Sequence, residues 1–499
     1  MTLEQALAKM NELQAAQQAY NHAMGVLSLD GDTAAPSASA KGRAETMGYL
    51  SGVTYRLLVN DEVKEALETI LSERSRVTPM QARQAELLKE DYDDSVRIPM
   101  DEYIAFSTLV TQSNAVWHEA KLKSDYAAFA PYLEKIIDFN RRFAGYKDAT
   151  KPAYDVLLDG FEKGTTTEAL DPFFSLLREK LTPVILEVAS RPEPDTSFFQ
   201  QRFPLHDQRL FSDKLMALMG LPRDRCGIAE TEHPFTTNFN KWDVRITTHY
   251  AENDVADSMY SVIHEGGHAL YELGTADEIQ FTNLASGATM GLHESQSRFY
   301  ENLIGRSLPF CRALLPLMQE CFPQQMQGVT AEQLYAAVNK ARPSLIRTQA
   351  DELTYGMHIA IRYEMEKLMI SGDAKVSELP AIWNRMYKDY LGVTVPSDRE
   401  GILQDVHWAG GQLGYFPSYA LGSAYGVQML SAMEKEFDPW ADVEKGDLSR
   451  VTAWLGEKIH RYGKLLTPSA LLQNAIGQPF DPNFYVEYLQ KKFSALYRL

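Results

Sequence analysis

The sequence predicts a mainly α-helical protein that carries one small β-sheet. Apolar residues recur at helical spacing along most of the 499 residues, whereas the alternation typical of strands is confined to one short region. Hydrophobic residues make up 45% of the chain, which is ample for a large buried core. The chain contains no internal repeat and no low-complexity tract, so we expect a single domain over residues 1–499.

The N-terminal part is expected to be helical. Its first residues, Met1–Gln5, open an amphipathic helix with acidic residues and lack the basic and then apolar pattern of a secretion signal. No stretch of the chain is long enough to span a bilayer, so we expect a cytoplasmic protein. The proline-rich run Arg191–Asp195 predicts an exposed loop within the helical body.

Two neighbouring segments predict strands. Thr237–Phe239 and Asp243–Tyr250 alternate apolar and polar residues, which is typical of a small hairpin or sheet. Arg245, Thr247 and His249 fall on one face of the second segment, because alternate residues of a strand point to the same side. An edge strand there can bind an extended peptide backbone; a partly solvated structural sheet is the alternative.

The most informative element follows these strands: the run His264-Glu265-Gly266-Gly267-His268, an H-E-x-x-H pattern. On a helix, residues i and i+4 lie on one face, so two imidazoles can hold one metal ion beside Glu265. Zinc is the default ion because neutral imidazole suits it; Co²⁺ or another divalent ion is the alternative. Glu265 is then the candidate general base. Chance alone produces such a pattern in about one chain of this kind in a hundred, so its surroundings must support it.

The flanking residues favour a helix. Asn253 or Asp254 can cap its N-terminus, and apolar residues at helical spacing follow. The two glycines each disfavour the helix by about 1 kcal/mol relative to alanine. We therefore expect them to provide room, either for close packing or for the approach of a substrate.

Glu294 is the candidate third ligand. It follows His268 by 26 residues, in a segment with helical spacing that begins near Gly291. In one large class of such sites a Glu from a second helix completes the set and leaves the fourth position to water. A third-histidine pattern is excluded because Tyr271 and Gly274 occupy the positions that need Gly and His. Nearer carboxylates lie on the first helix or in the turn after it: Glu272, Asp277 and Glu278.

Charge, cysteine and histidine content narrow the class of protein further. The formal net charge of −18 argues against nucleic acid or an anionic membrane as the main partner. Five of the 11 histidines lie within 61 residues, which predicts one polar chamber where His233 and His293 support the ligands or line the pocket. The cysteines are odd in number and widely spaced, so we expect buried thiols without a catalytic role: Cys226, Cys311 and Cys321.

Together with the H-E-x-x-H run, five further segments resemble the carboxypeptidase Taq family of gluzincin metallocarboxypeptidases. They occur in the family's order and approximate spacing: His233–Phe235, Asp243–Thr247, His293–Gln296, Ile346–Asp351 and Gly401–Trp408. The resemblance implies a helical fold with a deep central groove, a divalent metal ion, a homodimer, and release of single residues from peptides with a free C-terminus. It also implies an N-terminal helical part over about residues 1–190, covering the groove, and a catalytic part over about residues 200–499.

Such an exopeptidase needs a fixed cation for the terminal carboxylate of its substrate. Arg347 is the best candidate, because guanidinium binds carboxylate through a bidentate fork. Asp351, at i+4 on the same predicted helix, can hold Arg347 in place. Arg245 is the second candidate. Tyr355 and His358 continue the face of Arg347 and can line the groove or serve a structural role.

The reaction also needs a group that stabilises the developing oxyanion. The Gly- and Tyr-rich segment after His407 predicts a loop that leads into a helix. Related gluzincins use a His followed shortly by a Tyr, so the resemblance assigns His407 and Tyr419, with Tyr415 as the alternative. Glu265 is expected to take a proton from the attacking water and pass it to the leaving amine.

Other functions are compatible with parts of the pattern. An oligopeptidase or dipeptidyl carboxypeptidase shares the metal site and the tyrosine segment. An aminopeptidase is disfavoured because no Gly-x-Met-Glu-Asn type segment precedes residue 264. A non-catalytic, metal-stabilised peptide-binding protein is disfavoured because a purely structural site does not need Glu265.

Overall fold

Helices build almost the whole protein, as the sequence predicts. The computed structural model describes all residues, 1–499, with twenty α-helices, several 3₁₀ turns, a π-helical turn (Phe299–Ile304) and a three-stranded sheet. The first eight helices are α1 (Leu3–Thr33), α2 (Ala40–Leu58), α3 (Asp61–Ser72), α4 (Pro79–Arg97), α5 (Met100–Lys123), α6 (Tyr126–Asp148), α7 (Ala153–Phe161) and α8 (Thr167–Ser190). The later helices are α9 (Leu205–Leu218), α10 (Val255–Leu273), α11 (Met290–Arg298), α12 (Leu308–Cys321), α13 (Ala331–Val338), α14 (Glu352–Ser371), α15 (Leu379–Leu391), α16 (Pro417–Glu436), α17 (Trp440–Val443), α18 (Ser449–Lys458), α19 (Pro468–Ile476) and α20 (Asn483–Tyr497).

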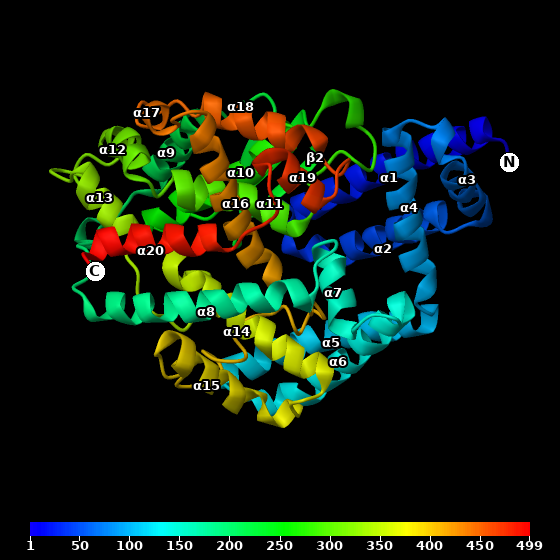
Figure 1. The fold of residues 1–499 in the computed structure, drawn as a ribbon, viewed down its shortest axis with the longest axis horizontal. Coiled ribbons are helices and arrows are strands. Elements are labelled where there is room, and N and C mark those ends of the chain that lie inside the picture. The colour runs from blue at the N-terminus through cyan, green and yellow to red at the C-terminus, as the bar shows by residue number, and fades with distance from the viewer.

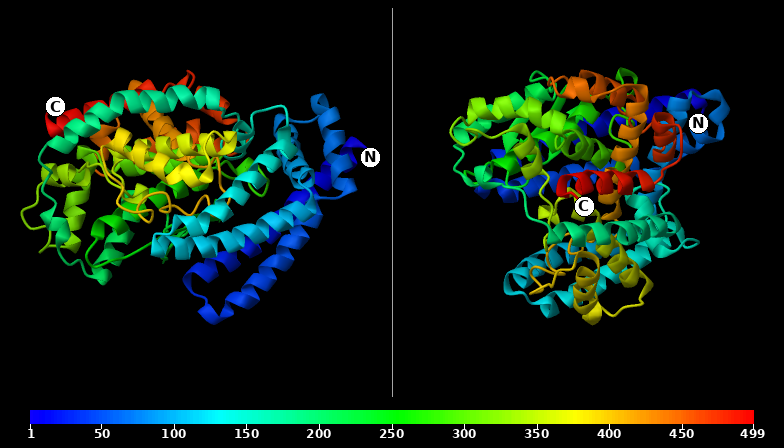
Figure 2. Two further views of the ribbon diagram at one scale, coloured as in Figure 1. Left: turned by 90° about the horizontal axis from the view of Figure 1, so that it is seen from below. Right: turned by 60° about the vertical axis from the view of Figure 1, so that its left-hand side comes forward.

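Two hydrophobic cores organise these helices. The smaller core joins α1, α3 and α4 through buried residues such as Met10, Leu67 and Leu88. The larger core draws its residues from α5 onward and includes the sheet. Helices α1–α4 lie at the end of the molecule opposite the C-terminus, while α8 and α20 run side by side along the main body (Figures 1 and 2).

The sheet lies directly beside α10. Its strands are β1 (Cys226–Glu230), β2 (Thr236–Asn240) and β3 (Asp243–Thr248), in the order β1-β3-β2. The antiparallel pairing of β2 with β3 confirms the predicted hairpin. Strand β1 pairs in parallel with β3 and was not predicted, because its short sequence shows no clear alternation.

Close packing explains the two glycines of α10. A Cβ on Gly267 would lie 2.7 Å from the backbone oxygen of Gln296, so only glycine lets α11 approach this closely. A Cβ on Gly266 would meet the side chain of Met219. Of the two explanations that the sequence left open, the structure therefore supports close packing. Asp254 caps α10 as predicted, accepting the backbone N–H of Asp257 at 3.1 Å.

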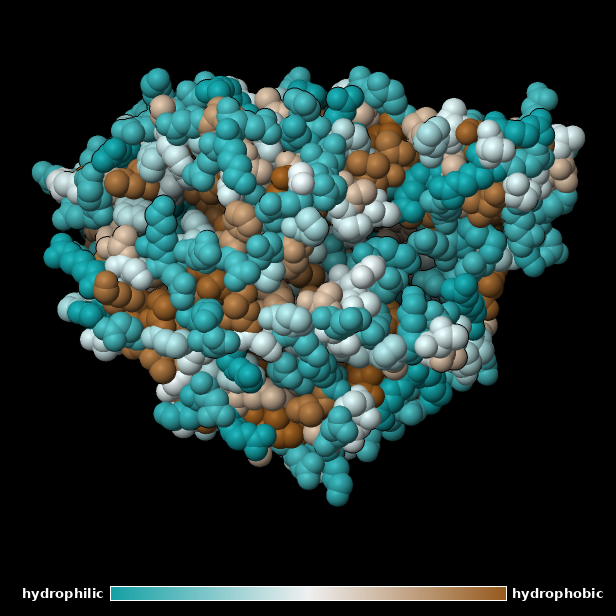
Figure 3. All heavy atoms as spheres, in the orientation of Figure 1, coloured by the Kyte–Doolittle hydropathy of each residue, from teal (hydrophilic) through white to brown (hydrophobic).

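Charged and polar side chains cover most of the face shown in Figure 3, and apolar side chains are scattered among them. None of the helices combines the length and the apolar character that crossing a membrane requires. The three cysteines are free; Cys226 and Cys311 are buried, and Cys321 is partly exposed. The predicted loop Arg191–Asp195 has no regular structure.

Candidate active site

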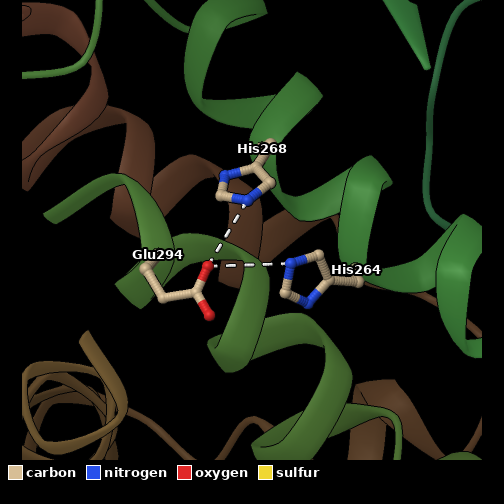
Figure 4. Close-up of side chains that lie close together, drawn as sticks. All are labelled: His264, His268 and Glu294. Atoms are coloured by element: carbon tan, nitrogen blue, oxygen red, sulfur yellow. Dashed lines mark ion pairs between the residues drawn. The ribbon is translucent and has the colours of Figure 1, made fainter. Parts of the chain in front are cut away.

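The three predicted metal ligands converge in the structure. His264 and His268 stand one turn apart on α10, and Glu294 reaches them from α11 (Figure 4). Oε2 of Glu294 lies 3.6 Å from Nε2 of His264 and 3.6 Å from Nε2 of His268. One ligand atom from each residue lies within 4.8 Å of the others. Two imidazoles and a carboxylate are the donor set of a catalytic metal site with an open position, so these residues fit a divalent ion.

Hydrogen bonds behind the two histidines turn their Nε2 atoms toward Glu294. Nδ1 of His264 lies 2.8 Å from Oε2 of Glu301, in the π-helical turn after α11. Nδ1 of His268 lies 2.6 Å from Nδ1 of His293. Nε2 of His293 in turn lies 2.7 Å from Oε1 of Glu272 on α10. Both chains of hydrogen bonds end on a carboxylate, which favours a proton on Nδ1 of each ligand and leaves its Nε2 lone pair for the metal.

Glu294 is ionised at neutral pH. Arg298, one turn later on α11, donates from Nε to Oε1 of Glu294 at 2.8 Å. The hydroxyl of Ser297 donates to Oε2 at 3.1 Å. Burial would raise the pKa of Glu294, but Arg298 and the two histidines outweigh burial and hold this pKa well below its usual range. The carboxylate is therefore available as a ligand.

Glu265, the candidate general base, is buried beside the ligands and tied to the sheet. The hydroxyl of Thr236 on β2 lies 2.6 Å from Oε2 of Glu265 and 3.0 Å from its backbone oxygen. This contact fixes the carboxylate relative to α10. No sequence pattern points to Thr236, because it and Glu265 are 29 positions apart and meet only in the folded chain.

Arg347 lies in a buried cluster of charges. Oδ1 of Asp405 accepts hydrogen bonds from Nε and Nη2 of Arg347 at 3.0 and 2.9 Å. Oδ2 of Asp405 accepts from Nε of Arg362 at 2.7 Å, and Nη1 of Arg347 donates to the Tyr355 hydroxyl at 3.2 Å. Burial would raise the pKa of Asp405, but the two arginines hold it well below its usual range. Two guanidinium groups share one carboxylate, so the cluster keeps a net positive charge.

The predicted helical pair between Arg347 and Asp351 is wrong. Arg347 lies in a 3₁₀ turn, and α14 begins only after Asp351, which is its N-cap. The Asp351 carboxylate accepts the backbone N–H of Thr354 at 3.0 Å and that of Arg342 at 2.9 Å. The i,i+4 spacing does not apply because the helix starts after Arg347. Asp351 therefore fixes the backbone, and Asp405 is the partner of Arg347.

His407, Tyr415 and Tyr419 form one aromatic group at the start of α16. Nε2 of His407 lies 3.4 Å from the Tyr419 hydroxyl, and the His407 ring stacks on Tyr415 with centroids 5.6 Å apart. The guanidinium of Arg347 lies over the Tyr419 ring at 5.1 Å. Burial lowers the pKa of His407 to about 4, despite the attraction of a nearby carboxylate, so its imidazole is neutral at pH 7. Burial raises the pKa of Tyr415, and the charge of Glu294 raises it further.

A short series of contacts joins the positive cluster to the metal ligands. Arg298, which bonds Glu294, places its guanidinium over the ring of Tyr355 at 4.5 Å. The hydroxyl of Tyr355 in turn accepts from Arg347. Side-chain contacts therefore link the predicted metal ligands to Arg347.

Other predicted residues take different positions. Arg245 on β3 forms two hydrogen bonds of 2.7 Å with Asp243 and is partly exposed. His233 is exposed in the connection between β1 and β2. His358 is fully buried and bonds a tyrosine hydroxyl at 3.0 Å, which is a structural role. Of the two candidate cations, Arg347 is the one that contacts link to the metal ligands.

Several residues of the site were not singled out from the sequence. Glu301 follows Glu294 by two helical turns, so its spacing could have indicated that both face the same side. The remaining contacts join residues far apart in the chain, and helical or strand periodicity cannot reveal them. The residues concerned are Thr236, Arg362 and Asp405. Arg298 is different, because it lies at i+4 from Glu294 on α11, a helical spacing that the sequence does show.

Known proteins resemble this chain from end to end. The family model of the carboxypeptidase Taq (M32) metallopeptidases matches residues 9–493. The chain is 41% identical to carboxypeptidase 1 of Bacillus subtilis over 484 residues, which covers 96% of each protein. It is 33% identical to thermostable carboxypeptidase 1 of Thermus thermophilus over 511 residues, covering 100% of both. The crystal structure of the M32 carboxypeptidase from Deinococcus radiodurans R1 matches with a TM-score of 0.95 at 35% identity, covering 99% of each chain.

Proposed function

Because the chain belongs to the carboxypeptidase Taq (M32) metallopeptidase family and is a metal-dependent carboxypeptidase, we propose that it holds one Zn²⁺ on His264, His268 and Glu294. Two neutral imidazoles and one carboxylate suit zinc, and Co²⁺ or another divalent ion is the alternative. When bound, the ion polarises the peptide carbonyl and activates water as a nucleophile near neutral pH. Metal analysis of the purified protein tests the identity of the ion.

Glu265 acts as the general base and then as the general acid. Its carboxylate lies beside the ligand histidines, and Thr236 holds one oxygen, which leaves the other free to take a proton from water. The same carboxyl group then delivers that proton to the nitrogen of the departing amino acid.

Arg347 binds the terminal carboxylate of the peptide. Asp405 and Tyr355 use only part of its five N–H donors, and the net positive charge that the cluster retains favours an incoming anion. Because this cation is buried and fixed, it selects a free C-terminus rather than an internal position of the peptide. The contact series from Glu294 to Arg347 is the observation that carries this assignment.

His407 and Tyr419 stabilise the oxyanion, with Tyr415 as the alternative. The neutral imidazole of His407 can donate one hydrogen bond, and burial raises the pKa of Tyr419 so that its hydroxyl keeps its proton. His233 remains a proposed pocket residue at the rim of the sheet.

A peptide with a free C-terminus and its C-terminal amide provide the test. We expect the free acid to lose single amino acids and the amide to be cleaved far more slowly, and a chelator to stop both reactions. Arg347→Gln should remove the preference for the acid. Arg245→Gln is the matched control and should keep that preference, because Arg245 contacts Asp243 and Phe239 rather than residues linked to the metal ligands.

The products separate this proposal from its nearest alternative. Dipeptides in place of single amino acids would assign the protein to the dipeptidyl carboxypeptidases or oligopeptidases. Equal trimming of acid and amide would contradict the role of Arg347. Binding of peptide without any turnover by the metal-loaded protein would instead indicate a peptide-binding protein.

The oligomeric state, compartment and domain organisation of the protein are also part of the proposal. We retain a homodimer from the family resemblance, which the mass of the protein in solution can test. Three free cysteines suit a reducing, cytoplasmic compartment. We also retain a single domain over residues 1–499, with a helical N-terminal part over about residues 1–190 and a catalytic part from about residue 200.

A further inference from the structure

Glu366 is a fully buried carboxylate outside the metal site. It stands on α14 and accepts three hydrogen bonds, one from α7 and two from the segment that precedes α16. The hydroxyl of Tyr154 and the backbone N–H of Gly414 donate to Oε2 at 2.7 and 2.8 Å, and Nε1 of Trp408 donates to Oε1 at 2.8 Å. A buried carboxylate is unfavourable unless such donors surround it, so this arrangement requires a structural or functional reason.

Two of these donors flank the residues proposed to stabilise the oxyanion. Trp408 directly follows His407, and Gly414 directly precedes Tyr415. Glu366 therefore hydrogen-bonds to both ends of the segment 408–414, which joins His407 to Tyr415 and Tyr419. Because one rigid carboxylate holds both ends, the distance between them is fixed from α14 rather than by the segment itself.

Helix α7 supports the same segment from the other side. Tyr154, the third donor, lies in the first turn of this helix. A Cβ on Gly414 would lie 2.9 Å from the backbone carbon of Leu157, and the φ of Gly414 is +99°, so only glycine fits this contact. The ring of Phe161 packs against Tyr415 with centroids 5.1 Å apart. The segment and its flanking residues thus contact both α7 and α14.

We infer that Glu366 is a positioning residue that, through Trp408 and Gly414, sets the placement of His407, Tyr415 and Tyr419 relative to the metal site. This inference rests on the proposed oxyanion role of those residues. Full kcat would then depend on Glu366, although its carboxylate takes no part in the reaction. Glu366 touches none of the proposed metal ligands, so the binding of the metal ion should not depend on it.

The chemistry of the site explains why a carboxylate is needed there. All three partners are hydrogen-bond donors, and both carboxylate oxygens accept. A glutamine of the same shape would point its NH₂ group at the indole N–H or at the Gly414 N–H. One donor would then face another donor, and one end of the segment would be released.

Glu366→Gln is the decisive variant, and Glu364→Gln is its matched control. Both exchange carboxyl for amide on α14, but Glu364 is partly exposed and pairs only with Lys367 at 3.6 Å. We expect Glu366→Gln to lower kcat roughly tenfold to a hundredfold, as small misplacements of catalytic groups do, with KM and bound metal unchanged. Hydrogen–deuterium exchange of peptides covering residues 408–416 should become faster. The control should leave all four quantities at their wild-type values.

Tyr154→Phe is a milder variant in case Glu366→Gln folds poorly. It removes one donor and keeps the hydrogen bonds of Glu366 to both ends of the segment. We therefore expect a smaller loss of kcat than in Glu366→Gln, together with faster exchange of the same peptides than in the wild type. Wild-type kcat and exchange in both variants would overturn the inference.

A combined variant with three substitutions separates this inference from the proposed function. If Glu366 acts through the oxyanion group, Glu366→Gln should add little to the loss that Tyr419→Phe with Tyr415→Phe causes. Losses that multiply would show that Glu366 acts independently and would overturn the inference. Wild-type kcat in the tyrosine variant alone would instead reject the oxyanion assignment, whatever Glu366 does to exchange.

Discussion

Replacing Asp405 by asparagine should destabilise the protein far more than the loss of an ordinary ion pair. Asp405 is the shared partner of Arg347 and Arg362, and all three side chains are shielded from water, with 12%, 8% and 0% of their surfaces exposed. Asparagine keeps the shape but removes the charge. Two guanidinium groups would then face each other without a counterion.

The expected size of the effect follows from this burial. Breaking a buried charged pair by neutralising one partner costs about 3–5 kcal/mol, because the remaining charge stays buried. Asp405 serves two such charges, so we expect the upper part of that range. The pair Arg209 and Glu230 also has two hydrogen bonds, at 2.7 and 3.0 Å, but its side chains are 47% and 49% exposed. Its loss should cost at most about 1 kcal/mol.

Urea unfolding at pH 7 of the wild type, Asp405→Asn and the control Glu230→Gln measures this difference. The midpoint of Asp405→Asn should fall well below that of the control. A free amino acid should raise the midpoint of Asp405→Asn more than that of the wild type, because its carboxylate can neutralise Arg347. If Asp405→Asn loses no more stability than Glu230→Gln, the two buried arginines do not need the charge of Asp405, and the reasoning is refuted.

Two further predictions concern histidines. Glu272→Gln should weaken metal binding by about tenfold or more in chelator competition, because Glu272 orients His293 and thereby His268; unchanged affinity would contradict this relay. His460 is fully buried, and burial lowers its pKa to about 3. The folded protein therefore favours the neutral form of His460, which contributes stability above pH 6.5. This contribution is lost as the pH falls toward 3. Between pH 8 and pH 5 the wild type should lose about 2 kcal/mol relative to His460→Gln, which cannot take up a proton. Parallel pH profiles of unfolding for the two proteins would contradict that prediction.

The features that the sequence predicted correctly are those determined by short stretches of chain. His264 and His268 are four positions apart, so a single helix brings both imidazoles to one face. The cap at Asp254 and the hairpin of β2 and β3 also depend on neighbouring residues. Glu294 needed one more step, because its position relative to α10 depends on how two helices pack. Gly267 makes that packing possible.

Arg347 shows where reasoning from the sequence stops. The assumption that it shares a helix with Asp351 was reasonable from spacing, but the helix begins later and its cap uses Asp351. The true partner, Asp405, lies 58 positions away and is brought close by the packing of the segment before α16 against α14. The parallel pairing of β1 with β3 was missed for the same reason. In both cases the contact is tertiary, and no periodicity in the chain encodes it.

The same limit applies to the chemistry of the ligands. The residue types of the site were readable from the sequence, but the nitrogen that each histidine presents to the metal was not. The tautomer depends on what bonds Nδ1, and these partners differ: Glu301 for His264, and His293 backed by Glu272 for His268. A direct carboxylate raises the basicity of its histidine more than one acting through a second imidazole. We therefore expect the two histidines to be unequal, with His264 the stronger donor to a bound ion, although the sequence motif presents them as equivalent.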